Sequence, residues 1–208
     1  MPALPAKLPE SKDSSPLKRC RTGGIKMRRA IGLLELKNIT KGIQAADVML
    51  KAANVEMIMA QPLCPGKYVV MVAGDVGAVQ SAVRSGKACG SDNVVDDFVL
   101  PNLHDGVFAA LTGCSDIHDI QALGVIESYS VASAIVAADT AAKAAAVTLI
   151  DVRLARGMGG KAVVTLTGDV GAVTAAVRAG SQMIQDTGFL VDQLVIPAPH
   201  KNLHSTLF

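Results

Sequence analysis

A long internal repeat is the feature that most constrains the fold of this chain. The hexapeptide at residues 74–79 (Gly-Asp-Val-Gly-Ala-Val) recurs unchanged at residues 168–173, an offset of 94 residues. Upstream, residues 30–35 (Ala-Ile-Gly-Leu-Leu-Glu) return as residues 122–127 (Ala-Leu-Gly-Val-Ile-Glu) at an offset of 92. The offset reaches 96 at the later Pro-x-x-His segments, so loops lengthen twice in the second copy. Such a long period indicates a duplicated domain rather than a solenoid of short repeats.

We place the first copy at residues 28–115 and the second at residues 118–208 of the 208-residue chain. Residues 1–27 stand apart, because they contain four prolines and three serines, with six Lys or Arg against two acidic residues. Without apolar periodicity, this composition predicts a disordered basic N-terminal tail. A second interpretation is that the basic cluster at residues 18–21 docks on an acidic partner surface.

Composition narrows the partners that this chain can have. Only 3% of the residues are aromatic, so few side chains are present on which nucleic-acid bases could stack. The net charge of +2 gives no strong field toward phosphate or membrane. No segment reaches the roughly 18 uncharged apolar residues of a membrane span, and residues 1–27 lack the apolar run that a secretory signal needs. We therefore expect no nucleic-acid and no membrane partner, a cytosolic location, and cysteines that are thiols or metal ligands rather than disulfides.

Each copy shows the same order of expected elements. In the first copy, short apolar runs predict four strands, at residues 29–36, 55–63, 68–73 and 94–100. Helix-favouring stretches at residues 39–53 and 76–87 lie between them, with Asp75 placed to cap the second helix. A short helix follows at the end of the copy. The order β-α-β-β-α-β predicts an α+β fold of two tandem ferredoxin-like (split βαβ) domains.

The turn between the second and third strands carries the most distinctive side chains. Its residues are Cys64, Pro65, Gly66 and Lys67 in the first copy and Gly157, Met158, Gly159, Gly160 and Lys161 in the second. Proline followed by glycine is typical of a type II turn, and Met158 aligns with Cys64. The glycine run lacks the spacing of a phosphate-binding loop, so it indicates a flexible hairpin. A lone cysteine is usually a small buried hydrophobe, but a threefold axis would bring three thiolates together.

Other polar residues indicate interfaces rather than catalysis. Glu35 and Glu127 lie inside apolar strands, where a charge needs a partner, and we expect pairing across an interface or with backbone N–H groups. His104 and His200 follow a strand-ending proline in both copies without nearby acid or base partners. No Ser-His-Asp set, carboxylate pair or His-Glu-x-x-His motif is present, so we expect a protein that is not an enzyme.

Taken in order, these motifs resemble the bacterial microcompartment shell domain. They are Ala-x-Gly-x-x-Glu, an Ala-rich helix with Asp-x-x-x-Lys, a Pro-Gly-Lys or Gly-Gly-Lys turn, Gly-Asp-Val-Gly-Ala-Val, and a strand ending in Pro-x-x-His. Two unpermuted copies are similar to the tandem shell proteins whose homotrimers form pseudohexamers. The resemblance covers about residues 29–204. It implies a structural tile that joins other shell proteins in a microcompartment shell within the cytoplasm.

The Cys-Pro-Gly-Lys turn, present in the first copy alone, resembles that of tandem shell proteins from propanediol-utilisation compartments. There the pore cysteines of three subunits ligate an iron–sulfur cluster. The resemblance implies that three Cys64 thiolates hold a 4Fe–4S cluster in the central pore, for electron transfer to an encapsulated redox enzyme. Lys67 would favour the thiolate and offset the cluster's charge. Two alternatives stay open: a tile with a cluster-free metabolite pore, and a trimeric nucleotide-binding regulatory module, which the absence of a phosphate loop disfavours.

The resemblance also implies a tile edge. Lys51 and Lys143 lie in the Asp-x-x-x-Lys motifs, where the aliphatic stem of each lysine packs along its counterpart on a neighbouring tile. His104 and His200 are assigned to the same edge. Many family members have an arginine between the strand-ending proline and this histidine, and neither copy here has one. We therefore expect a weaker or differently made contact between tiles.

Overall fold

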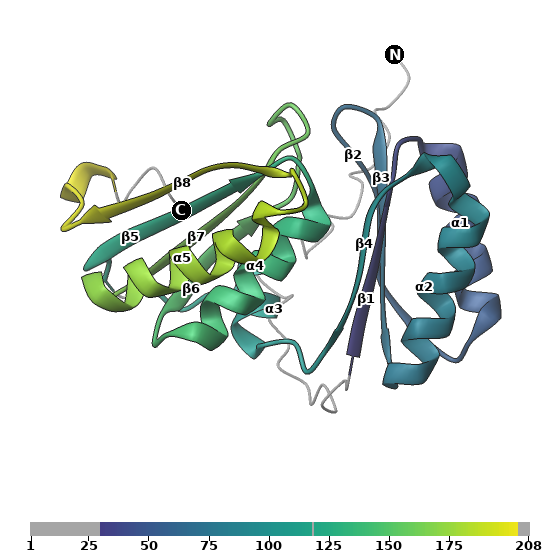
Figure 1. Ribbon diagram of the computed structural model, residues 1–208, viewed down its shortest axis with the longest axis horizontal. Helices are drawn as coiled ribbons and strands as arrows, with labels where there is room; N and C mark the ends of the chain where they lie inside the picture. The colour runs from purple at the N-terminus through teal and green to yellow at the C-terminus, as the bar shows by residue number, and fades with distance from the viewer. Residues whose placement is uncertain (1–29, 118, 204–208) are drawn as a thin grey trace, which may run out of the picture.

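The computed structural model describes residues 30–117 and 119–203, so the tail expected at residues 1–27 lies outside the described residues. The described chain forms two four-stranded sheets, each covered on one face by two helices (Figure 1). Every strand pair is antiparallel. Among the described helices, none combines the length and the apolar character needed to cross a bilayer.

The first sheet has the order β2-β3-β1-β4, as expected for a split βαβ unit. Its strands are β1 (Ala30–Leu36), β2 (Glu56–Leu63), β3 (Lys67–Gly74) and β4 (Val94–Pro101). Its helices are α1 (Ile39–Ala52) and α2 (Val76–Gly90), followed by the 3-10 turn η1 (Ser91–Asn93) and, after β4, by α3 (Asp105–Thr112). The expected order of elements in this copy is confirmed.

The second sheet repeats this topology with the order β6-β7-β5-β8. Its elements are β5 (Ala122–Ser128), α4 (Val131–Ala144), β6 (Thr148–Arg153), β7 (Ala162–Gly168), α5 (Val170–Gln185) and β8 (Leu190–Pro197). The registers of β1 and β5 match position by position, since Glu35 pairs with Asp96 as Glu127 pairs with Asp192. The duplication read from the sequence is therefore also a duplication of structure.

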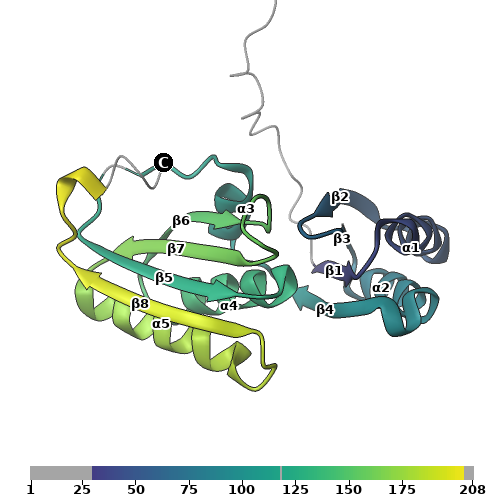
Figure 2. The ribbon, with the colours of Figure 1, turned by 90° about the horizontal axis from the view of Figure 1, so that it is seen from above.

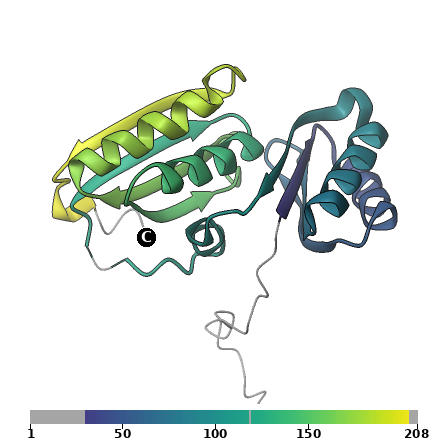
Figure 3. The ribbon, with the colours of Figure 1, turned by 60° about the horizontal axis from the view of Figure 1, so that its bottom comes forward.

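The two faces of the first sheet bury different partners. Alternate residues of a strand point to opposite faces. Leu34 and Leu36 pack with residues of α1 and α2, whereas Ile31 and Leu33 belong to a core shared with α3 and the second domain. Figures 2 and 3 show α4 on the side of the second domain that meets β4. The helix-free face of the first sheet is thus an interface between the domains.

The glycine of the Ala-x-Gly-x-x-Glu motif has a packing reason in both copies. A Cβ atom on Gly32 would lie 2.5 Å from Val83 Cγ2, and one on Gly124 would lie 2.7 Å from Val177 Cγ2. Contacts this short do not occur between real side chains, so any larger residue would push the strand and helix apart. The glycine of the motif is therefore needed for the close packing of α2 and α5 on their sheets.

Two local expectations need correction. Asp75 occupies the N-cap position of α2, but its side chain accepts no capping hydrogen bond. Asn38 and Ser130 cap α1 and α4 through their side-chain oxygens. Cys114 is disulfide-bonded, whereas Cys64 and Cys89 are free thiols. The sequence alone contains no information on how close two sulfur atoms lie in the fold.

Candidate functional site

The turn that carries Cys64 differs in register from the expected type II turn. The Gly66 N–H donates to the Leu63 carbonyl at 2.9 Å, so Cys64 and Pro65 are the two central residues. The Cys64–Pro65 peptide bond is cis, and Gly66 has a φ of +100°. A cis proline occurs at the third position of a turn, which is where Pro65 lies in the observed register. The Pro-Gly pair is thus compatible with this register and with the expected type II turn. Cys64 therefore lies at a central corner of the turn.

The equivalent turns of the two domains lie near each other at the upper edge of the molecule, where the domains meet (Figure 1). The Cys64 N–H donates to the Ala155 carbonyl at 2.9 Å, and the Arg156 guanidinium donates to the Gln61 side chain. A Cβ atom on Gly160 would lie 2.9 Å from Pro65 Cδ, which shows how closely the turns approach. The internal repeat thus places both candidate pore turns side by side.

Within the described residues, one chain offers one thiol at this place and no complete metal site. Cys64 is exposed and free. No group of three or more His, Cys, Asp or Glu side chains in residues 30–117 and 119–203 is arranged to hold a metal ion. Met158, the counterpart of Cys64, is half-buried. A cluster at this turn would therefore need cysteines from several chains.

The Lys67 ammonium, which we expect beside the Cys64 thiolate, has hydrogen-bond partners in both domains. It donates to Glu35 Oε1 at 2.7 Å, to the Tyr129 carbonyl at 2.9 Å and to the Gly160 carbonyl at 3.4 Å. The Glu35 side chain is fully buried, and a buried carboxylate needs a countercharge. The ammonium therefore serves the joint between the domains, and its effect on the Cys64 thiolate stays a prediction.

The second oxygen of the Glu35 carboxylate accepts hydrogen bonds from the start of α4. Its Oε2 atom accepts hydrogen bonds from the Val131 N–H at 2.9 Å, from the Ser130 hydroxyl at 3.0 Å and from the Ala132 N–H at 3.4 Å. The first N–H groups of a helix lack intrahelical acceptors, and this end carries partial positive charge. The expected pairing of Glu35 across an interface and with backbone N–H groups is confirmed.

Sequence reasoning missed Asp96, which completes this joint. The carboxylate of Asp96 accepts from the Ser133 hydroxyl at 2.7 Å and shares the single Ser130 hydroxyl proton with Glu35. Ser130 could have been found, because a serine before an Ala-rich helix is a capping signal. Nothing local in the sequence links Asp96 to it, since the two residues lie 34 positions apart in different domains.

The second copy contains the same Glu–Lys pair in a more open setting. Lys161 donates to Glu127 Oε1 at 2.8 Å, with 29% of the Glu127 side chain exposed. The hydrogen bond to Glu127, its negative charge and a smaller contribution from Tyr129 together raise the pKa of Lys161. In the described chain, Glu127 thus pairs with Lys161 as Glu35 pairs with Lys67, but no helix start donates hydrogen bonds to Glu127 as α4 does to Glu35.

The residues assigned to the tile edge lie on the surface or near α3. Lys51 pairs with Asp47 at 2.7 Å, and Lys143 pairs with Asp139 at 2.6 Å. The other Asp139 oxygen accepts the His104 N–H at 2.8 Å, which ties the start of α3 to α4. Their role between tiles stays a prediction.

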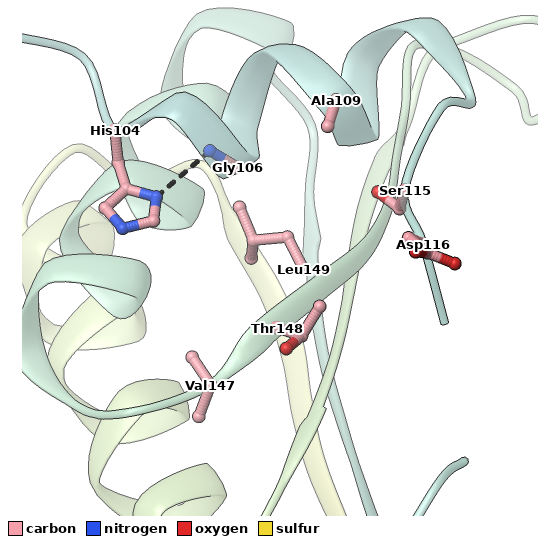
Figure 4. A pocket seen from close by; sticks show the side chains of 8 residues that line it. All are labelled: His104, Gly106, Ala109, Ser115, Asp116, Val147, Thr148 and Leu149. Atoms are coloured by element: carbon pink, nitrogen blue, oxygen red, sulfur yellow. Dashed lines mark hydrogen bonds between the residues drawn. The ribbon is translucent and has the colours of Figure 1, made fainter. Parts of the chain in front are cut away.

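The two histidines act locally on the backbone. His104 Nδ1 accepts from the Gly106 N–H and His200 Nδ1 accepts from the Asn202 N–H, both at 3.2 Å. A cavity of about 200 Å³ lies between α3 and the start of β6. Figure 4 shows His104 at this cavity with its Nδ1 turned to Gly106, so the imidazole acts as a helix cap.

Comparison with known proteins identifies both repeats. The BMC domain family matches residues 30–103 and residues 122–199. The chain is 46% identical over 177 residues to the bacterial microcompartment shell protein PduT of Citrobacter freundii, covering 85% of this chain and 96% of that protein. It is 38% identical over 82 residues to the shell protein PduA of Citrobacter freundii, covering 38% of this chain and 88% of that protein.

A solved structure gives the same result. The crystal structure of a microcompartment protein from Desulfitobacterium hafniense is 51% identical and superposes with a TM-score of 0.76, covering 85% of this chain and 98% of that one. The relatives are shell proteins, which points to a structural role rather than an enzymatic one. The chain belongs to the bacterial microcompartment shell proteins and is a shell tile with two BMC domains in tandem.

Proposed function

We propose that this shell protein forms a homotrimer whose central pore carries an iron–sulfur cluster, held by Cys64 of three chains, for electron transfer across the shell. The observation that carries the proposal is the free, exposed Cys64 thiol on a turn held between the two domains. A sulfur on such a turn is accessible to ligands, while the bond from the Cys64 N–H to the Ala155 carbonyl restrains the backbone that bears it.

The donor set fits a cluster shared by three chains. Iron–sulfur clusters usually have four cysteine ligands, so three Cys64 thiolates would leave one iron of a 4Fe–4S cluster to a non-protein ligand. The Lys67 ammonium is occupied by Glu35, so it adds no free positive charge beside the cluster. A bound cluster would supply one-electron transfer, and an encapsulated redox enzyme would be its partner.

The second candidate function is a pore for a small metabolite, with Cys64 unligated. One observation favours it: Cβ atoms added to Gly66, Gly157 or Gly159 would meet no other atom within 4 Å. These three positions of the turns therefore face open space on the described chain. Three chains closing a ring around these turns would leave an opening lined by small residues.

Anaerobic reconstitution with iron and sulfide separates the two functions. The purified chain and the Cys64→Ser and Cys89→Ser variants are compared by iron content, absorption and paramagnetic resonance. Cys89 is the matched control, because it is the other free thiol of the described chain and lies partly buried on α2. A cluster signal lost only in Cys64→Ser supports the redox function. A trimer that takes up no iron contradicts it and favours the metabolite pore.

The tile is also expected to contact other shell proteins through Lys51 and Lys143. Exposed lysines of this kind can pack their stems on a neighbour while the ammonium groups stay hydrated. Replacing both by alanine is expected to abolish sheets or tubes of the expressed protein in electron micrographs without changing the trimer. Unchanged sheets would remove these lysines from the tile edge.

A further inference from the structure

A polar cavity of about 300 Å³ lies at one end of the second sheet and shares no residue with the pore turns or with the joint between the domains. It is bounded by the start of β6, the end of β7, the residue before α5 and the segment that leads into β5. None of the described residues that line it is basic. Five of them have side-chain oxygen atoms: Asp119, Gln121, Thr148, Thr167 and Asp169. We call these five residues the linker pocket.

The two carboxylates of the linker pocket have no countercharge within the described chain. Neither Asp119 nor Asp169 forms an ion pair with a described Lys, Arg or His. Asp119 Oδ1 accepts the N–H of its neighbour Ile120 at 2.9 Å. Asp169 occupies the N-cap position of α5, but its side chain makes no capping hydrogen bond. Two carboxylates that line one cavity repel each other, and a cation between them relieves this repulsion.

Thr167 provides a second, independent observation. This residue is only 6% exposed, and its Oγ1 atom has no hydrogen-bond partner in the described chain. Thr167 pairs directly with Thr148 across β7 and β6, so both hydroxyl side chains lie on the same face of the sheet. A buried hydroxyl without a partner costs free energy. The Thr167 hydroxyl therefore marks a wall of the cavity where a bound ligand gains a hydrogen bond.

The first copy of the repeat lacks this combination. Ala73 occupies the position of Thr167, since the two residues have the same register in their sheets. In the sequence, Arg29 corresponds to Gln121 at the offset of 92 residues. The first copy thus has no hydroxyl on this strand position and has a basic residue where the second copy has an amide. The features that favour a cation are specific to the second domain.

We propose that the linker pocket binds a hydrated divalent cation, calcium or magnesium, through the carboxylates of Asp119 and Asp169, with the Thr167 hydroxyl bonded to the water shell of the ion. Both ions prefer oxygen ligands, and magnesium is commonly held by one or two carboxylates while it keeps several waters. Six waters need about 180 Å³ at about 30 Å³ each, so the cavity accommodates the ion with its water shell.

The bound ion has a structural role in this proposal. Asp119 lies in the segment between the two domains, whereas Asp169 lies directly before α5. An ion held by both ties this segment to the second domain. The described chain has no group of three acidic, Cys or His side chains that forms a complete metal cage, so water supplies the remaining ligands. The proposal depends neither on the proposed trimer nor on the iron–sulfur cluster.

Titration calorimetry on the full chain, freed of metal by a chelator, tests the site with calcium chloride and with magnesium chloride. Binding of a single ion per chain is expected, together with a higher melting temperature, because the ion binds only the folded state. Asp169→Asn should weaken binding at least about tenfold, since it removes one of the two negative charges. Asp75→Asn is the matched control and should leave binding unchanged. Asp75 is the N-cap residue of α2 in the first copy and also makes no side-chain capping bond.

Thr167→Val gives a second readout that separates binding from folding. Valine keeps the shape and removes a hydroxyl that has no partner, so in chelator this variant should melt no lower than the unmodified chain. With the ion present, its gain in melting temperature should be smaller. An unmodified chain that shows neither binding heat nor a shift in melting temperature at several millimolar of either ion overturns the proposal. Binding that survives Asp169→Asn, or that Asp75→Asn weakens equally, also overturns it, and unchanged binding by Thr167→Val overturns the role of the hydroxyl.

Discussion

Replacing Glu35 by glutamine tests the account of the joint between the domains. The carboxylate is fully buried and forms an ion pair with the Lys67 ammonium. It also accepts hydrogen bonds from the Ser130 hydroxyl and from the first N–H groups of α4. Glutamine keeps the shape but removes the charge, so the ammonium loses its countercharge at a site with little water. Breaking a buried pair in this way costs about 3–5 kcal/mol.

The expected result is a large fall in the melting temperature. For a chain of this size, 1 kcal/mol corresponds to about 2–4 °C, so Glu35→Gln should lower the midpoint by about 6–20 °C. Midpoints are compared by calorimetry at one protein concentration, because assembly also changes them. Lys87→Met is the control: it breaks an exposed pair with Asp97, which is worth at most about 1 kcal/mol.

A double variant distinguishes a lost charge pair from a general packing defect. Adding Lys67→Met to Glu35→Gln removes the ammonium that has lost its countercharge, and with it the cost of burying an uncompensated charge. The double variant should therefore melt above Glu35→Gln, and the two substitutions should not be additive. If Glu35→Gln lowers the midpoint no more than Lys87→Met does, the joint is not held by this buried carboxylate.

Further predictions concern packing, capping and pH. Gly124→Ala should lower the free energy of unfolding by about 1–3 kcal/mol through overpacking against α5, whereas Gly77→Ala, which has open space, should not lower it; urea denaturation measures both. Ser130→Ala should lower it by about 0.5–2 kcal/mol in the same assay, through loss of a helix cap. Because the pKa of Lys161 is raised in the folded state, its pairing with Glu127 stabilises the fold fully below pH 10.5. This contribution is lost as the pH rises through the higher pKa of the folded state. The melting temperature of Lys161→Met should therefore fall less steeply with pH in this alkaline range than that of the unmodified chain.

The repeat and the apolar runs were sufficient to predict the fold of each domain. Strand and helix positions depend on local patterns of apolar residues, and the two copies supported each other. The glycine and glutamate of the Ala-x-Gly-x-x-Glu motif could be singled out for the same reason. Gly32 and Gly124 pack against helices of their own domain, which an expected β-α-β-β-α-β order already places nearby.

The partners of the charged residues could not be predicted with the same success. Glu35 was expected to have a partner, but Lys67 was assigned to Cys64, because the two lie three residues apart in a turn. The hydrogen-bond acceptors of Lys67 include the carbonyls of Tyr129 and Gly160 in the other domain. Such contacts depend on how the domains dock, and docking buries residues that no local periodicity connects.

The duplication has a consequence for how the proposed trimer comes apart. The contact inside the chain joins two domains of one polypeptide, whereas the contacts of the proposed trimer join separate chains. A linker raises the effective concentration of its partners to the millimolar range or so, whereas the contact between chains depends on the protein concentration. Dilution should therefore separate the chains while the Glu35–Lys67 joint stays closed. A dilution series should accordingly give monomers that keep the hydrogen-exchange protection of the Val131 amide; loss of that protection together with the trimer would show that the inner joint depends on the ring.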